Sequence, residues 1–324
     1  MGIPALARAR VSPGFLFALL AFAPGSTRAL QGGATHVLLV TGLSAEPRFA
    51  KAFGAAASAI YDAARGPWHV GDSDLVYLAE DPTVDPGRIT GKSTRAAVQQ
   101  AFESMAERTH PGDVVLVVLI GHGSGELGAS AVNLPGPDAT AADYASWIAP
   151  LGKATVIFVN ASSASGDFGA VLAGPNRVIV TATKTAMERN ESIFAGFFAT
   201  GLSSLAADAD KNGSVSVAEA FDYARDQVAR AYEATNRLQT EHPTLVDSAG
   251  VAARVAFGGA STSADPRVIA LVGERRLLEA RVDSLRRVKS TMDSTAYQDA
   301  LETLLLQIAA KTRAIAQAQA GAHR

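Results

Sequence analysis

The hydrophobic positions of this chain follow two different periods, and these periods predict its main elements. Short continuous apolar runs rich in β-branched residues are typical of strands buried on both faces of a parallel sheet. Such runs lie at residues 36–42, 75–78, 113–120, 155–159 and 177–181. Stretches suited to helices lie between these runs and after the last of them. The first stretch ends at Arg65, and the others cover residues 92–108, 139–148, 193–205 and 217–234. Strands that alternate with helices imply right-handed crossovers, so the pattern predicts an α/β fold with a mainly parallel sheet.

Composition places the chain among globular proteins and excludes some functions. Its 324 residues are 48% hydrophobic and 19% charged, enough for one domain of about 200 residues with an appendage. A net charge of −2 gives no basic surplus for binding nucleic acid. The chain has no cysteine, which excludes disulfides and thiolate metal sites.

The amino terminus has the pattern of an export signal. Arg8 and Arg10 precede the short apolar run 15–23, and small residues follow up to Ala29. This order predicts a signal peptide over residues 1–29 and a periplasmic or secreted protein, with an apolar amino-terminal helix as the alternative. Neither this run nor any later segment is long enough to predict an integral membrane segment.

Polar side chains follow two of the predicted strands. Residues 121–124 read Gly-His-Gly-Ser directly after the run 113–120, and residues 160–166 read Asn-Ala-Ser-Ser-Ala-Ser-Gly after the run 155–159. Open α/β sheets place their sites at the carboxyl ends of their strands. We therefore expect His122 to lie near the serines of the second segment.

In this order, the two segments resemble the caspase-like fold, and in particular the legumain-type (C13) cysteine peptidases and their bacterial relatives. The resemblance covers residues 35–257 and implies a caspase-like sheet flanked by helices. It implies that His122 is the general base and that the nucleophile stands three residues before Gly166. That residue is Ser163, next to Ser162.

Serine at the nucleophile position leaves several functions open, because a serine hydroxyl needs a well-aligned base whereas a cysteine ionises partly near neutral pH. One is an exported peptidase homologue with weak or no cysteine-peptidase activity. A second is a serine-type peptidase or esterase, with His122 as base, Ser163 or Ser162 as nucleophile, and backbone N–H groups near Gly123 and Ser163 as oxyanion donors. A third is a pseudo-enzyme that binds a protein partner, or a calcium-dependent scaffold of the cell envelope. The expected partner is a peptide or protein.

Two further segments bear on the resemblance. By position Glu188 and Arg189 line a substrate cleft, with a solvated loop as the alternative. Residues 241–245 resemble a segment that closes the domain in this family. The family's basic substrate-pocket motif has no clear match in residues 41–48, so the sequence does not support Asn or Asp specificity.

Residues 208–219 match a twelve-residue EF-hand loop, with Gly213 at the sharp turn. Oxygen ligands in this number suit a hard cation, Ca²⁺ before Mg²⁺. The loop occurs once, which favours a structural brace over a sensor, and an Asp/Asn turn that caps a helix is the alternative. The expected ligands are Asp208, Asp210, Asn212, Ser214, Ser216 and Glu219.

The carboxy-terminal part of the chain differs from the rest. Small and polar residues at 258–266 predict a linker. Apolar residues then recur mostly at threes and fours over residues 267–318, interrupted by the helix-capping residues 293–295. This pattern predicts a helical hairpin close to an antiparallel coiled coil, which packs on the core or on a protein partner.

Overall fold

A computed structural model of the protein describes residues 33–125, 129–209, 211, 213–257 and 292–322, with single residues and pairs between 267 and 289. The predicted signal peptide 1–29, the predicted linker 258–266, and the predicted calcium ligands Asp210 and Asn212 lie outside the described residues.

The centre of the protein is a mostly parallel sheet, as predicted. Its strands stand in the order β11-β9-β8-β4-β1-β2-β3, and all neighbours are parallel except β11, which runs antiparallel to β9. The strands are β1 (Thr35–Thr41), β2 (Leu75–Ala79), β3 (Gly91–Lys92), β4 (Val114–Ile120), β8 (Thr155–Asn160), β9 (Arg177–Thr181) and β11 (Thr244–Val246). A small antiparallel sheet of β5 (Gly123–Ser124), β6 (Ala131–Val132) and β7 (Ala139–Thr140) follows β4.

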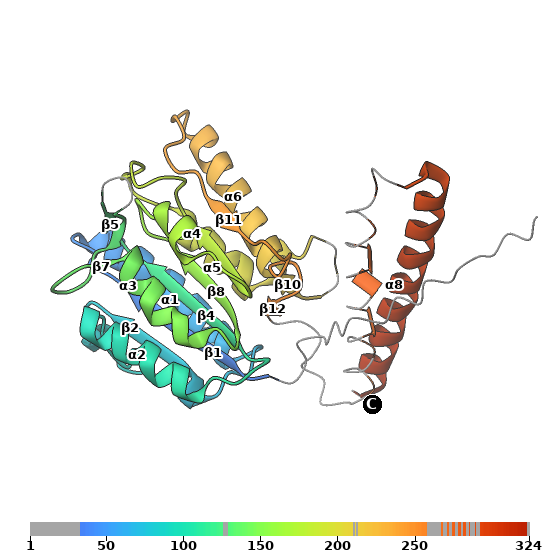
Figure 1. Ribbon diagram of the computed structural model, residues 1–324, viewed down its shortest axis with the longest axis horizontal. Helices are drawn as coiled ribbons and strands as arrows, with labels where there is room; N and C mark the ends of the chain where they lie inside the picture. The colour runs from blue at the N-terminus through green and yellow to red at the C-terminus, as the bar shows by residue number, and fades with distance from the viewer. Residues whose placement is uncertain are drawn as a thin grey trace, which may run out of the picture.

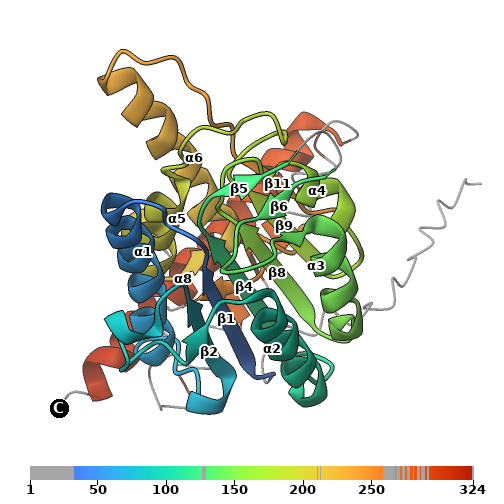
Figure 2. The same ribbon diagram turned by 90° about the vertical axis from the view of Figure 1, so that its left-hand side faces the viewer.

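Helices cover both faces of the sheet. Figure 2 shows α1, α5 and α6 on one side, and α2, α3 and α4 on the other. The helices are α1 (Pro47–Arg65), α2 (Arg95–Arg108), α3 (Ala141–Ile148), α4 (Asp167–Leu172), α5 (Phe194–Ser203) and α6 (Val217–Ala234). Single turns of 3-10 helix occur at Asp72–Asp74, Pro82–Val84, Ala149–Leu151 and Leu205–Ala207.

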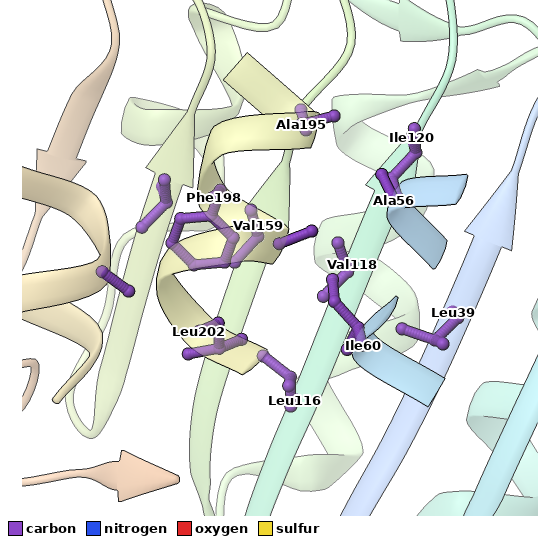
Figure 3. Close-up of a cluster of buried hydrophobic side chains, with 14 of the residues drawn as sticks. Leu39, Ala56, Ile60, Leu116, Val118, Ile120, Val159, Ala195, Phe198 and Leu202 are labelled. Carbon is purple, nitrogen blue, oxygen red and sulfur yellow. The ribbon is translucent and has the colours of Figure 1, made fainter. Parts of the chain in front are cut away.

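The alternation of side chains along β4 explains why both faces need cover. Leu116, Val118 and Ile120 point into the core beneath α1 and α5, which Figure 3 shows in close-up. The intervening residues Val115 and Val117, together with Leu119, belong to the opposite core beneath α2, α3 and α4. All six side chains are buried, so the continuous apolar run of the sequence follows from burial on both sides.

Capping residues set the helix starts. Thr94 accepts a hydrogen bond from the Ala97 N–H at 3.3 Å and caps α2, which begins at Arg95 rather than at the predicted residue 92. Helix α3 begins at Ala141 rather than at the predicted residue 139, because Thr140 and Asp143 form a capping box. The two residues before it pair with β6 instead.

The chain ends in the long helix α8 (Ser294–Ala322), which Figure 1 shows set apart from the α/β body. Ile315 of α8 packs with Leu271, and Lys311 forms an ion pair with Glu274. Nearer the start of α8, Lys289 lies 5.6 Å from the centre of the Tyr297 ring. One side of α8 therefore contacts Leu271, Glu274 and Lys289. Across the described residues, no helix combines the length and apolarity that spanning a bilayer requires.

A buried charge cluster joins the amino-terminal ends of β1 and β4. The ring of His36 lies between two carboxylates, 3.0 Å from Asp74 and 3.3 Å from Asp113. Asp113 also accepts hydrogen bonds from the backbone N–H groups of Ala34 and His110, both at 2.7 Å. Burial pushes the pKa of the Asp113 carboxyl up, but the hydrogen bonds from His110, His36 and Ala34 together outweigh it and hold that pKa below its usual value.

This cluster predicts how stability depends on pH. Because the pKa of Asp113 is lower in the folded protein than in the unfolded chain, its contribution is present above the unfolded value and is lost as the pH falls through the folded value. Asp113→Asn is expected to cost about 1–3 kcal/mol at pH 7, since donors aimed at the carboxylate lose their charged acceptor. Urea unfolding should show the difference shrinking in strong acid. A constant difference at all pH values would contradict this role.

Candidate functional site

The strand order of the sheet reverses between β1 and β4. The chain passes from β1 outward to β2 and then returns across β1 to β4, which makes this pair the topological switch point, where open α/β sheets bind ligands. Gly42 follows β1, and His122 follows β4 at the same edge. Asn133 ties the two loops together: its carbonyl accepts from Leu43 N–H at 2.9 Å, and its N–H donates to the His122 carbonyl at 3.0 Å.

His122 is held in an aromatic environment. Its ring meets the rings of Phe49 and Phe53 of α1 edge-on, with centroids 4.6 and 5.3 Å apart. The guanidinium of Arg48 lies over the Phe49 ring, 4.3 Å from its centroid. The same guanidinium forms an ion pair with Glu191 at 3.6 Å. Within the described part of the chain, the His122 side chain has no hydrogen-bond or ion-pair partner, so no third residue orients it as a base.

Ser163 stands in the loop after β8, which adjoins the loop that carries His122. Its hydroxyl bonds to the backbone of Gly123 instead of to His122. The Oγ atom accepts a hydrogen bond from Gly123 N–H at 3.1 Å and donates to the Gly123 carbonyl at 3.3 Å. The side chain is 2% exposed. No hydrogen bond joins Ser163 to His122 among the residues that the structure describes. The structure thus brings the two predicted catalytic residues to adjoining loops without pairing them.

Ser162 is further from any catalytic role. It is fully buried, and its hydroxyl donates to Asn160 Oδ1 at 2.6 Å, an oxygen that also accepts from the Ser162 N–H at 3.1 Å. Asn160 is buried as well and lies on the face of the sheet opposite His122, because it continues the alternation of Val156 and Phe158. The Ser162 hydroxyl is therefore part of a turn that ends β8.

Gly123 determines how closely the two strand-end loops approach. A Cβ atom at this position would stand 2.1 Å from the Ser163 carbonyl oxygen and 2.9 Å from Ser162 Oγ. No side chain fits there, so the loop after β8 closes directly onto the backbone after β4. The Gly123 N–H, a predicted oxyanion donor, is occupied by the Ser163 hydroxyl in this arrangement.

The loop after β9 is fixed by two carboxylates. Glu188 accepts from the His242 N–H and lies 3.0 Å from its Nδ1, and the Glu188 carbonyl accepts from Ala164 N–H at 2.8 Å. Glu241, 1% exposed, takes hydrogen bonds from Ser192 Oγ and from the N–H groups of residues 193 and 194. Burial raises the pKa of Glu241 above its usual value, against the lowering effect of these bonds. Arg189 is exposed and contacts Met187.

A shallow cavity lies beside this loop. It has a volume of about 190 Å³ and is lined by Glu191, Ile193, Ala231, Tyr232, Thr235 and Arg237. Glu191 also pairs with Arg48, which covers the ring beside His122. The cavity and the aromatic environment of His122 are therefore linked through one ion pair.

The predicted calcium loop folds into a tight turn. Asp208 Oδ2 accepts from the Gly213 N–H at 2.8 Å, and Gly213 has φ of 81°, a conformation that favours glycine. At the other end Glu219 Oε1 accepts from the Ala209 N–H at 3.1 Å. The carboxylates of Asp208 and Glu219, at loop positions 1 and 12, thus both accept hydrogen bonds from backbone N–H groups of the loop itself.

Glu219 also takes part in capping the start of helix α6. Its Oε2 accepts from Ser216 N–H and Oγ, each at 2.8 Å, and Ser216 Oγ accepts from Glu219 N–H at 3.2 Å, which completes a capping box. Strand β10 (Val215–Ser216) pairs antiparallel with β12 (Ala256–Phe257), so residues from the end of the domain brace the loop. Ser214 is buried at the start of this strand.

The donor set of this loop fits a hard cation. Every expected ligand offers oxygen, as Ca²⁺ requires. In the part of the chain that the structure describes, no three acidic or histidine side chains form a metal-binding group, and that part lacks Asp210 and Asn212. Calcium binding therefore stays a prediction.

The sequence indicates the strand-end loops but not their surroundings. Phe49 and Phe53 have the spacing of a buried helix face, which gives no sign that His122 packs on them. Glu241 has no local signal either, since its three hydrogen-bond donors lie 47 to 49 residues earlier.

Comparison with models of known protein families finds no match to this chain, and comparison with curated protein sequences finds none either.

The close approach at Gly123 gives a direct test of the loop geometry. Gly123→Ala is expected to destabilise the protein by about 1–3 kcal/mol, because the new methyl group would overlap the Ser163 carbonyl. Gly54→Ala is the matched control. A Cβ there meets nothing within 4 Å, and in the interior of α1 the change is expected to be neutral or to stabilise by up to about 1 kcal/mol. Equal effects in denaturant unfolding would refute the predicted packing.

Proposed function

We propose that this protein is an exported, caspase-like relative of the legumain-type (C13) peptidases whose strand-end site has lost peptidase activity and which acts by binding calcium and a protein or peptide partner. The single observation that carries this proposal is the engagement of the Ser163 hydroxyl by the backbone of Gly123 rather than by His122.

The resemblance to the family rests on the residues of the strand ends. Gly-His-Gly-Ser follows β4, and the serine segment follows the neighbouring strand β8. Residues 244–246, which overlap the segment 241–245 that resembles the domain-closing segment of this family, add the antiparallel edge strand β11. These features support a caspase-like domain, while the serine at position 163 removes the thiolate on which the family's reaction depends.

The geometry disfavours acyl transfer for three reasons. A serine nucleophile needs a base that takes its proton, and the Ser163 hydroxyl donates instead to the Gly123 carbonyl. The Gly123 N–H, which would stabilise an oxyanion, is bonded to the same hydroxyl. Finally, His122 lies against two phenylalanine rings, and no carboxylate among the described residues orients its ring.

A serine-type hydrolase is the second candidate, and one observation favours it. Ala164, next to Ser163, has φ of 53°, in the left-handed region that costs about 1–3 kcal/mol for such residues and that clusters at active sites. In this reading, rotation of Ser163 would release its hydroxyl to His122 and the Gly123 N–H to a substrate oxyanion.

Calcium binding is the second part of the proposal. The loop 208–219 supplies oxygen ligands at the spacing of an EF-hand, and its described backbone turns at Gly213. Since Glu219 is both an expected ligand and the capping residue of α6, a bound ion would hold the start of that helix. The pairing of β10 with β12 supports a bracing role over a sensor role.

Partner binding is the third part. Met187 is exposed on the loop after β9, and Leu238 is exposed on the loop after α6. The cavity beside residues 191–193 is lined by residues that follow β9 and by residues in and just after α6. These features favour a peptide or protein as the occupant of this face. The predicted signal 1–29 supports action in the periplasm or outside the cell, and the helical hairpin predicted over residues 267–318 would offer a second contact surface.

The catalytic question is settled by covalent labelling. We expect a fluorophosphonate probe to leave Ser163 unlabelled in the folded protein, because the hydroxyl is buried and unactivated. Ser163→Cys tests whether the site accepts the family's own nucleophile, with Ser163→Ala as the unreactive control. Labelling is read by peptide mass spectrometry.

His122→Ala separates the outcomes of this experiment. Labelling of Ser163 that disappears in His122→Ala would establish the serine hydrolase and refute the pseudo-enzyme. Absence of labelling in both proteins, with unfolding cooperative in each, supports the proposal.

The calcium proposal is tested by stability. Extracytoplasmic sites bind with dissociation constants up to about 10⁻⁴–10⁻³ M, and ligand at about 100 times that constant stabilises a protein by about 2.7 kcal/mol. Glu219→Gln keeps an acceptor for the capping box but loses the bidentate carboxylate. We expect calcium to raise the Tm of the unchanged protein and not that of Glu219→Gln, while magnesium has a smaller effect. An equal calcium response in both would exclude this loop as the site.

A further inference from the structure

The outer side of α8 carries an apolar patch that the rest of the described chain does not cover. Leu305 and Leu306 are 50% and 62% exposed, and the alanines at 309 and 310 are exposed beside them. An exposed helix face is ordinarily lined with charged side chains. Here the patch is bordered by three, Asp299 and Glu302 before it and Arg313 after it.

Most of this patch lies opposite the side that contacts Leu271, Glu274 and Lys289. Ala310, at the edge of the patch, also lines a cavity of about 330 Å³ with Glu274 and Leu278. At 3.6 residues per turn, Glu302, Leu306, Ala309 and Arg313 fall within about 60° of arc. Tyr297, Lys311 and Ile315, which contact the preceding segment, lie on the far side of the helix. The helix therefore has two contact faces, and the described chain uses one.

Charge along α8 is distributed unevenly. Its acidic residues, Asp299 and Glu302, stand in the first third, whereas its basic residues, Lys311 and Arg313, stand in the second half. Two such helices placed side by side in the same direction would oppose like charges. Placed in opposite directions, they oppose acid to base.

The apolar residues have the same symmetry. With a two-fold axis between residues 307 and 308, Glu302 of one helix faces Arg313 of the other, and Leu305 and Leu306 face Ala310 and Ala309. Large residues then meet small ones, which lets two helices approach closely and interdigitate. A two-fold interface requires self-complementarity of this kind, in which residue i contacts j and j contacts i.

We infer that α8 is a self-association surface: a second copy of this chain docks on the outer side of α8, antiparallel, with its centre at residues 305–310. The inference depends neither on the strand-end site nor on calcium. A membrane surface is a poorer occupant, since it would favour a basic border and this one carries Asp299 and Glu302.

Light scattering on the exported, purified protein tests the association. A dimer mass is expected, and Leu306→Asp should convert it to a monomer with unchanged helical circular dichroism, because the leucine is exposed within one chain. Val84→Asp, which alters a still more exposed apolar residue outside α8, should leave the dimer intact. A monomer for the unchanged protein, or a dimer that survives Leu306→Asp, would overturn the inference.

Charge exchange tests the register. In a dimer of Glu302→Arg, arginine would face arginine at both ends of the patch. In a dimer of Arg313→Glu, glutamate would face glutamate. Each variant should therefore dimerise more weakly than the unchanged protein. An equimolar mixture of the two should recover dimers, because each arginine then faces a glutamate. Failure of the mixture to recover, with both single variants weakened, would exclude the antiparallel pairing. Binding of the unchanged but monomeric protein to anionic vesicles, lost in Leu306→Asp, would assign the patch to a membrane instead.

Discussion

The contact between Gly123 and the loop after β8 is the constraint on which the strand-end site depends. The Ser163 carbonyl occupies the space that any side chain at position 123 would need, and the Ser163 hydroxyl bonds both backbone groups of the glycine. One close approach therefore fixes the ends of two neighbouring strands, determines the direction of the serine, and engages the N–H group that would stabilise an oxyanion. The same contact that packs the loops would also account for the proposed loss of catalysis.

Much of the fold was predictable because burial and local capping act on nearby residues. The run of β-branched residues in β4 and the capping box at Ser216 each specify an element without reference to distant parts of the chain. The start of α3 was predicted two residues early because residues 139–140 pair with β6, a contact that no periodicity encodes.

The candidate site was less predictable for a related reason. Strand order brought His122 and Ser163 to one edge of the sheet, as their positions after β4 and β8 implied. Whether two side chains meet there depends on rotamers and loop conformations that tertiary contacts select. The packing of His122 between Phe49 and Phe53, and the left-handed conformation of Ala164, belong to that class.

The position of Glu241 has a consequence for the order in which the protein folds. Its carboxylate satisfies the first N–H groups of α5, which begins 47 residues earlier, and the residues just after it form the edge strand β11. Farther along, β12 completes the pairing of β10. A chain emerging amino terminus first can form β1 to β9 while α5 still lacks its cap and the sheet its last strand. Closure of the domain must therefore wait until residue 257 has emerged, so contacts of long sequence separation come last and slow the final step.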